Sequence, residues 1–333
     1  MTGATLRAGS LRRPARARRT TRSRGRPDDA RRSAHVPPDK TLLIGWFSFP
    51  DGEATAGDLL ALRAVQDALT DAGLPHETAW SPGLAAGGRP ALEEVPAEEF
   101  GRLVFLCGPA HGEQVAALHT RFAHCLRIAV GVSVVDPDAD AVRGFHHVLA
   151  RDAAGLPPEP DLSLAARPAG GPPPVAAVVL THGPGEDGDS RHRRVADALA
   201  DWLPGRDCAF ADLDTGLGRD DWRLCRTADQ CQALLTRFDL VVTDRLHGLV
   251  LALRAGVPVL AVDPVHGGAE VTAQARACGW PALVPVERLT GPELDRWWTW
   301  CLTSGPARAR RARAALLGRR DDDQLDRLVA LLR

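Results

Sequence analysis

The chain has 333 residues, enough for two α/β domains of ordinary size, and its 44% hydrophobic and 25% charged residues are typical of a soluble globular protein. A formal net charge of −1 argues against nucleic-acid binding through bulk electrostatics. The single lysine, Lys40, lies at the edge of an arginine-rich N-terminal segment, so Schiff-base and P-loop chemistry, which need a lysine in the ligand pocket, are excluded.

The beginning of the chain differs in composition from the rest. Residues 1–40 are rich in arginine and have almost no apolar pattern, so we expect a disordered basic tail. No apolar core of a secretory signal follows these arginines, and no apolar run has the roughly 20 residues of a membrane span. The seven cysteines include no CxxC pair, so we expect free thiols, no metal site and a cytoplasmic location.

An N-terminal Rossmann-like domain is expected over residues 41–156. Residues 41–47 form a short apolar run that is typical of a buried parallel strand. Residues 59–72 have apolar side chains at helical spacing, and Gly73 ends that helix. Further strands are expected at residues 75–80, 102–108 and 127–135, with a helix at residues 110–125. Alternating strands and helices predict a parallel sheet with helices on both faces.

A linker and a second Rossmann-like domain are expected next. Residues 157–174 are dense in proline and glycine, which neither regular structure tolerates, so we expect the domain boundary there. The domain after it is expected over residues 175–333, with helices at its end. Its strands are expected at residues 175–180, 239–243 and 257–262, and its helices at residues 191–202, 227–236, 246–255 and 321–333. Two such halves predict an α/β fold of two Rossmann-like domains that face a ligand cleft.

The clearest candidate for chemistry is the segment of residues 239–248, Asp-Leu-Val-Val-Thr-Asp-Arg-Leu-His-Gly. After an apolar strand, Arg245, His247 and Gly248 are expected in the first turn of a helix, where free backbone N–H groups attract anions. An arginine offers forked donors to carboxylate or phosphate, a histidine can supply a proton, and a glycine permits close approach. The alternative is an ion pair between Arg245 and Asp244, with His247 only capping the helix.

Several segments resemble the polysaccharide pyruvyl transferase family. Residues 243–248, Thr-Asp-Arg-Leu-His-Gly, followed by Gly-Val-Pro at 256–258, are similar to the C-terminal signature of that family. Residues 147–152 with 160–162 are similar to a second family element. The resemblance extends over most of residues 41–300 and implies a glycosyltransferase-B-like fold.

This resemblance also implies an activity, the transfer of a pyruvyl group from phosphoenolpyruvate to a sugar or glycan. A pyruvate ketal would form and phosphate would be released. His247 would be catalytic, because a proton must reach the methylene carbon of the donor. Phosphoenolpyruvate would be a donor substrate, so neither a cofactor nor a metal is implied. The substrate-binding residues that the resemblance implies are Asp244, Arg245, His247, Gly248, Gly57, Asp58 and Arg151.

The sequence departs from the family pattern at two places, and two alternatives follow. Of the Gly-Asn-x-Gly-Asp loop found in many members, only Gly57 and Asp58 are kept, and Glu270 replaces the lysine that many members carry after a later strand. One alternative is a nucleotide-sugar glycosyltransferase or epimerase of the same fold. The other is a non-catalytic member that binds a ligand. The expected partners are a small-molecule donor and a sugar or glycan acceptor, with no nucleic acid and no transmembrane segment.

Overall fold

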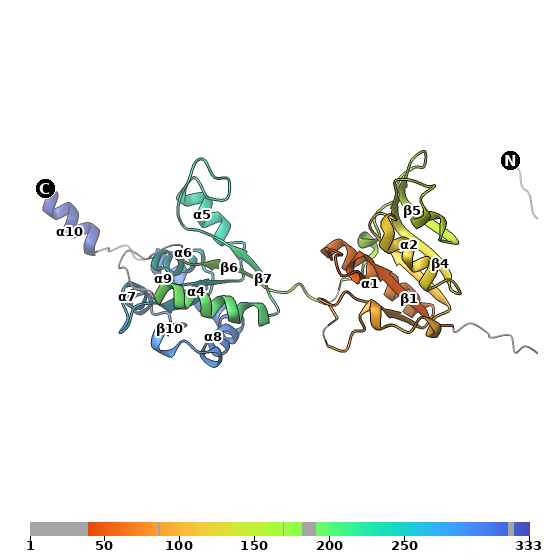
Figure 1. Ribbon diagram of the computed structural model, residues 1–333. Helices are drawn as coiled ribbons and strands as arrows, with labels where there is room; N and C mark the ends of the chain where they lie inside the picture. The colour runs from red at the N-terminus through yellow and green to blue at the C-terminus, as the bar shows by residue number, and fades with distance from the viewer. Residues whose placement is uncertain (1–38, 86, 169, 182–190, 319–322) are drawn as a thin grey trace, which may run out of the picture. The chain divides into compact units, whose positions relative to one another are not determined.

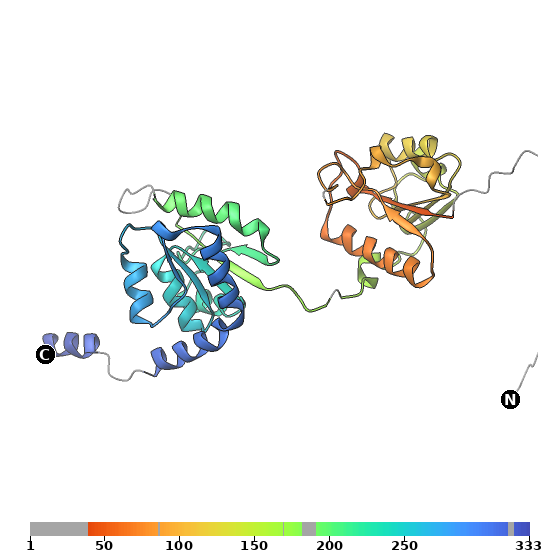
Figure 2. The same ribbon diagram turned by 90° about the horizontal axis from the view of Figure 1, so that it is seen from below.

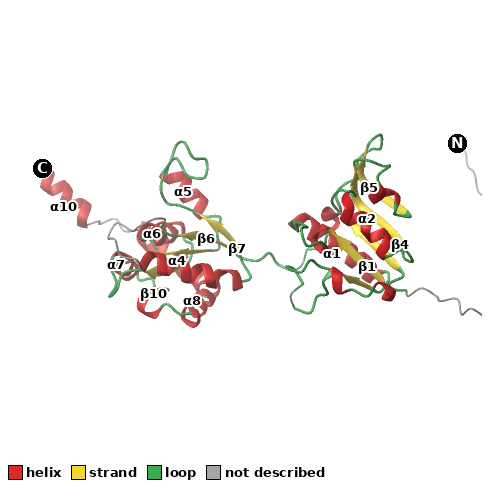
Figure 3. Ribbon diagram, viewed as in Figure 1, coloured by secondary structure: helices red, strands yellow, loops and turns green. Residues whose placement is uncertain are grey.

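The computed structural model describes residues 39–85, 87–168, 170–181, 191–318 and 323–333. The chain divides into two compact units, Met1–Arg167 and Pro168–Arg333, and strands alternate with helices in each (Figures 1 and 3). Residues 1–38 of the expected basic tail lie outside the described residues. Lys40, which the sequence assigned to this tail, belongs instead to the first unit, where its Nζ lies 2.5 Å from a carboxylate oxygen of Glu77.

The first unit contains one parallel sheet with the strand order β2-β1-β3-β4-β5. Its strands are β1 (Thr41–Gly45), β2 (His76–Thr78), β3 (Arg102–Leu106), β4 (Leu126–Val134) and β5 (His147–Ala153). Its α-helices are α1 (Ala56–Asp71), α2 (Gly112–Arg121) and α3 (Asp140–Arg143). Short 3-10 helices are η1 (Trp46–Ser48), η2 (Leu92–Glu94), η3 (Ala97–Glu99) and η4 (Leu162–Ala165).

Both faces of this sheet are covered, as the apolar run at residues 41–47 predicts. Successive side chains of β1 point to opposite faces. Leu42 and Ile44 pack in the core that includes α2, whereas Leu43 packs in the core that includes α1. Figure 2 shows α1 and α2 on opposite sides of the sheet. All three side chains are fully buried, and each contributes about 1.5–3 kcal/mol relative to an exposed position.

The second unit contains a parallel sheet with the strand order β10-β9-β8-β6-β7. Its strands are β6 (Val175–Val179), β7 (Ala209–Asp212), β8 (Leu240–Thr243), β9 (Val259–Asp263) and β10 (Leu283–Pro285). Its α-helices are α4 (Arg191–Trp202), α5 (Ala228–Leu235), α6 (Leu246–Ala255), α7 (Glu270–Ala277), α8 (Gly291–Thr303), α9 (Gly305–Leu317) and α10 (Asp323–Leu332). Two 3-10 helices are η5 (Leu203–Gly205) and η6 (Val286–Arg288).

Helices cover both faces of this second sheet as well. On one face, α4 contacts α8. The ring of Trp202 in α4 meets that of Trp298 in α8 edge to face, with centroids 5.5 Å apart. Figure 2 shows α4, in green, along that side of the sheet. Helix α6 contacts α5, α7 and α9. None of the helices within the described ranges is long and apolar enough to cross a membrane.

Both sheets have the same topology. Numbered along the chain, each has the order 2-1-3-4-5, which is found in doubly wound α/β domains. In this order the direction in which successive strands are added to the sheet reverses between the first and third strands, and ligands bind at the carboxyl ends of the strands next to that point. The predicted fold class of two Rossmann-like α/β domains is therefore confirmed. The switch points are β1/β3 in the first unit and β6/β8 in the second. The cleft between the domains stays a prediction of the sequence.

The division between the units lies after Arg167, inside the stretch that the sequence assigns to a linker, but the first half of that stretch is packed. Helix η4 lies against α1, and Leu162 packs on the core beneath it. Gly131 has a φ of 65°, and a Cβ there would lie 2.6 Å from Cδ1 of Leu162, so a larger residue would strain the backbone and displace this side chain. Arg167 forms an ion pair with Asp71. The chain therefore stays on the first unit beyond residue 157, because these contacts hold it there.

Candidate functional site

The candidate site of the second unit is centred on Asp244, at the carboxyl end of β8. The Asp244 residue is 1% exposed. Its Oδ1 accepts hydrogen bonds from the backbone N of Thr181 at 2.8 Å and from its Oγ1 at 3.2 Å, and its Oδ2 lies 2.9 Å from Nδ1 of His192. Thr181 follows β6 and His192 lies in the first turn of α4, so Asp244 joins the two elements beside the switch point. Its carboxylate is buried among protein donors and positions its neighbours, in contrast to the substrate contact that the resemblance implies.

Arg245 precedes α6 and is held at the sheet edge by a contact that the sequence did not predict. Its Nη1 donates to Oδ1 of Asp214 at 2.6 Å, and each of the two side chains is 31% exposed. Asp214 follows β7, and the same Oδ1 accepts from the backbone N of Gly216 at 2.8 Å. The alternative of an Arg245–Asp244 pair is therefore wrong. Asp214 fixes the direction of a guanidinium that carries five N–H donors.

The start of α6 lacks a side-chain cap from the described residues, as do the starts of α2, α7, α8 and α9, whereas α1 and α5 have one. Thr55 caps α1 and Thr227 caps α5 through their side-chain oxygens. No side chain of the described residues caps α6 in this way. His247, the second residue of α6, is exposed. The first turn of α6 therefore has backbone N–H groups that no side chain within the described ranges caps, and the positive end of the helix dipole lies beside an arginine and a histidine.

Packing explains why residue 248 is a glycine. A Cβ at this position would lie 2.1 Å from Oγ1 of Thr243. That hydroxyl is buried, donates to the backbone oxygen of Val179 at 2.7 Å and accepts from the backbone N of Arg245 at 3.0 Å. The glycine thus lets α6 pack against the end of β8, and the close neighbour is a side chain of the same segment.

The loop after β9, where the sequence departs from the family, is organised by Asp263. This residue is fully buried, and its carboxylate accepts from the backbone N–H groups of Val265, Ala269 and Thr272 at 2.8–3.0 Å. Burial raises the pKa of Asp263, but the hydrogen bonds from Thr272 and the loop backbone outweigh it and leave the pKa below its usual value. Glu270 is the exposed first residue of α7, where a negative charge suits the helix dipole.

Gly57 and Asp58 lie in the first turn of α1 in the first unit. Asp58 and Thr55 form a capping box: Oδ2 of Asp58 accepts from the backbone N of Thr55 at 3.1 Å and from its Oγ1 at 2.7 Å, and the backbone N of Asp58 donates back at 3.2 Å. A Cβ on Gly57 would have Thr55 Oγ1 as its neighbour at 3.6 Å, an ordinary contact. Asp58 therefore stabilises the start of α1.

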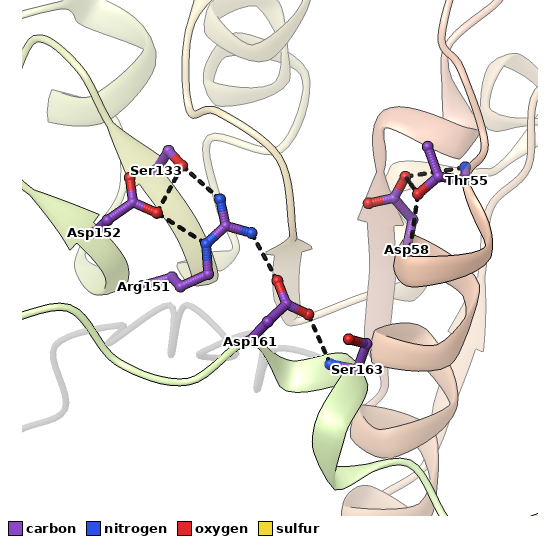
Figure 4. A network of polar contacts seen from close by, with 7 residues as sticks. All are labelled: Thr55, Asp58, Ser133, Arg151, Asp152, Asp161 and Ser163. Carbon is purple, nitrogen blue, oxygen red and sulfur yellow. Dashed lines mark hydrogen bonds and ion pairs between the residues drawn. The ribbon is translucent and has the colours of Figure 1, made fainter.

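Arg151, on β5, is the centre of a polar network (Figure 4). It donates from Nε to Asp152 at 2.8 Å, from Nη1 to Asp161 at 2.7 Å and from Nη2 to Ser133 at 2.7 Å. Asp161 in turn accepts from the backbone N of Ser163 and caps η4. The guanidinium has a protein partner on each of its three nitrogens, so the network ties η4 to β5.

The structure brings Asp58 and Arg151 to the same edge of the first sheet, as Figure 4 shows. Both interact electrostatically with the thiol of Cys107, which directly follows β3. Burial, together with the charges of Asp58 and Asp161, raises the pKa of that thiol to about 12, although Arg151 opposes the shift. Cys107 also has a left-handed backbone with φ of 62°. Residues from α1, from β5 and from the position after β3 thus lie near one another at the carboxyl edge of the sheet.

Two residues of the second unit were missed by the sequence analysis. His192 is one basic residue among several in an amphipathic helix, and Asp214 is one of several aspartates near β7, so neither has a local signal. Its position shortly after β7, at the carboxyl end of a strand, could have indicated Asp214 as a site residue. Within the described part of the chain, no group of three or more His, Cys, Asp or Glu side chains is arranged to hold a metal ion.

A comparison with protein-family models supports the family resemblance of the segment around α6. The model of the family "Polysaccharide pyruvyl transferase" matches residues 223–266, which include β8, the start of α6 and β9. None of the curated proteins matches the chain.

Solved structures of glycosyltransferases and epimerases are similar over most of the chain, but distantly. The spinosyn forosaminyltransferase SpnP is 13% identical, with 88% of this chain and 99% of that chain covered and a TM-score of 0.32. Glycosyltransferase SnogD from Streptomyces nogalater is 16% identical, with 88% and 99% covered and a TM-score of 0.29. UDP-GlcNAc 2-epimerase from Methanocaldococcus jannaschii is 10% identical, with 84% and 99% covered and a TM-score of 0.29. We infer nothing about this chain from structures with such low TM-scores. The match to the family model confirms the resemblance to polysaccharide pyruvyl transferases for residues 223–266.

Proposed function

We propose that this chain is a transferase that moves a pyruvyl group from phosphoenolpyruvate to a sugar or glycan, with a ketal as product. The observation that carries the proposal is the start of α6. There a segment that matches the pyruvyl transferase family presents an arginine, an exposed histidine and a helix N-terminus that no described side chain caps. A fixed cation beside the first-turn N–H groups of a helix favours anionic ligands.

Phosphoenolpyruvate suits such a site because it carries a carboxylate and a phosphate. In the proposal, Arg245 and the first N–H groups of α6 bind one of the anionic groups. The contact from Asp214 directs the guanidinium of Arg245 and reduces the entropy that it loses on binding. His247 supplies the proton that converts the methylene carbon to a methyl group.

The first unit contributes further proposed substrate-binding residues, namely Gly57, Asp58 and Arg151. Their support is that Asp58 and Arg151 both interact electrostatically with Cys107, which follows β3 at the carboxyl end of the sheet, where parallel sheets bind ligands. A cytoplasmic location is also part of the proposal, and it is supported by the free thiols of all seven cysteines. The acceptor sugar is left open.

The test is release of inorganic phosphate from phosphoenolpyruvate in the presence of a panel of sugars and lipid-linked glycans. Nuclear magnetic resonance of the product should show the methyl signal of a ketal. Arg245→Ala serves as the control for contaminating phosphatases, because its weaker binding should reduce release by the protein itself when phosphoenolpyruvate is limiting. Nucleotide sugars are assayed in parallel. If they are consumed while phosphoenolpyruvate is not, the proposal is wrong and the glycosyltransferase or epimerase alternative replaces it.

A further inference from the structure

A buried carboxylate orients a second histidine at the same sheet edge. We propose that His192 is the general base that activates the acceptor hydroxyl, and that Asp244 positions it. The inference rests on the proposed function and extends it to a residue outside the segment that matches the family, residues 223–266. It is carried by the contact between Nδ1 of His192 and Oδ2 of Asp244, at 2.9 Å.

The hydrogen-bond pattern decides which nitrogen of His192 is available. The backbone N of Thr181 can only donate, so Oδ1 of Asp244 is an acceptor. An ionised carboxylate also accepts at Oδ2, which requires the proton of a neutral His192 to be on Nδ1. Nε2 then carries the lone pair and can accept a proton. The imidazole is 24% exposed, so it is accessible from solvent, whereas the side chain of Asp244 is 0% exposed.

The position of His192 fits a role at the α6 site. Strands β6 and β8 are hydrogen-bonded neighbours, and Thr181 follows the first while Asp244 follows the second. Asp244 also directly precedes Arg245 in the chain. His192 therefore lies at the carboxyl edge of β6 and β8, the same edge on which the proposed anion site of α6 is built.

Ketal formation needs both an acid and a base. When the first acceptor oxygen bonds to C2 of phosphoenolpyruvate, its proton passes to Nε2 of His192, and C3 takes a proton from His247. When the second acceptor oxygen bonds to C2, the bond from C2 to the phosphate oxygen breaks and its electron pair leaves with phosphate. His192 returns its proton to the phosphate, and the proton of the second hydroxyl restores His247. Two hydroxyl protons thus end in the methyl group and in hydrogen phosphate.

A second histidine of this unit provides a matched control. His266 lies after β9, and its Nδ1 lies 2.6 Å from Oε1 of Glu287. His266 is 70% exposed and Glu287 is 32% exposed, so this pair is solvated, whereas Asp244 is fully buried. If the contact of His192 with Asp244 had only a structural role, loss of the His192 imidazole should lower turnover as little as loss of the His266 imidazole.

The experiment compares His192→Asn with His266→Asn and the wild type. Asparagine can still donate to Asp244 but cannot act as a base. We expect kcat for phosphate release to fall about 10²–10⁴-fold in His192→Asn, with phosphoenolpyruvate affinity by calorimetry and the melting temperature nearly unchanged. His266→Asn should keep wild-type kcat. If His192→Asn is as active as the wild type, the base role is refuted while the proposed function stands. Absence of phosphate release by the wild type itself contradicts both.

A second variant tests the positioning role of Asp244 without depending on His192→Asn folding. In Asp244→Asn the amide NH₂ faces His192, which forces the histidine proton onto Nε2. Nitrogen-15 chemical shifts of His192 should therefore report an Nδ1–H tautomer in the wild type and an Nε2–H tautomer in the variant. The same variant should lose turnover about 10²-fold or more. An Nε2–H tautomer in the wild type, or full activity in Asp244→Asn, overturns the inference.

Discussion

Gly248 packs directly against the side chain of Thr243: a Cβ on the glycine would lie 2.1 Å from the threonine Oγ1. The hydroxyl cannot move without losing its buried hydrogen bond to the backbone oxygen of Val179 at 2.7 Å. The start of α6, with its arginine and histidine, is thereby held against the end of β8. Correct placement of the proposed anion site depends on this contact.

Gly248→Ala should therefore destabilise the second unit. The added methyl displaces Thr243, and overpacking of this kind costs about 1–3 kcal/mol, which outweighs the gain of up to about 1 kcal/mol in helix propensity. Chemical denaturation followed by circular dichroism measures the change. Thr243→Ala combined with Gly248→Ala should recover part of the loss, because the clash is removed.

Gly57→Ala is the matched control, since Gly57 also lies in the first turn of a helix. A Cβ there would meet Thr55 Oγ1 at 3.6 Å, which is an ordinary contact. Its free energy of unfolding should be unchanged or higher by up to about 1 kcal/mol. Equal destabilisation of both variants would contradict the packing argument for Gly248.

Arg245→Ala should weaken the binding of phosphoenolpyruvate by about 1.5–3 kcal/mol, because a charged hydrogen-bond donor is lost. Stability should change by less than about 1 kcal/mol, since its ion pair with Asp214 is partly exposed. Isothermal titration calorimetry measures the first quantity and thermal melting the second. Arg254→Ala, an exposed arginine at the other end of α6, should bind like the wild type. Unchanged affinity in Arg245→Ala would refute the anion site.

His247→Asn should lower turnover far more than affinity, by about 10²–10⁴-fold, if His247 donates the proton to the methylene carbon. Asparagine keeps a hydrogen-bond donor but cannot transfer a proton. Steady-state assays of phosphate release give kcat, and calorimetry gives the affinity for the donor. Because His247 is exposed, the melting temperature should not change. A loss of affinity with intact kcat would assign His247 to binding alone.

The first unit should lose stability in acid through Asp161. Its pKa is lowered mainly by hydrogen bonds from Ser163, with a further contribution from Arg151. A carboxyl whose folded pKa is depressed stabilises the fold above its unfolded value, roughly pH 3.9 for aspartate, and this stabilisation is lost as pH falls through the folded value. The melting temperature of the wild type should therefore fall below about pH 4.

Asp161→Asn should be less stable than the wild type at neutral pH and less sensitive to acid. Thermal melts across the pH range test both expectations. Asp51→Asn, at an exposed position, serves as the control and should follow the wild-type curve. If Asp161→Asn keeps the full acid dependence, another carboxyl is responsible.

The sequence by itself predicted the elements on which the proposed site is built. The run of apolar residues that ends at Thr243, followed by Asp-Arg-Leu-His-Gly, was sufficient to predict β8 and the start of α6, whereas anion binding at that helix terminus stays a prediction. These features are local, because strand burial, helix termini and the direction of first-turn N–H groups depend on residues within a few positions of one another. The two α/β series could be read in the same way, since their apolar periodicity repeats along the chain.

The partners of these residues were decided only by the tertiary structure. Arg245 pairs with Asp214, which is 31 positions away, and Asp244 pairs with His192, which is 52 positions away. Likewise, Arg151 reaches Ser133 and Asp161 from different elements, so the stretch after residue 157 packs on the first unit instead of leaving it. Such contacts depend on which strands are neighbours in the sheet. Strand order is set by burial across the whole domain, so no short segment of sequence encodes these partners.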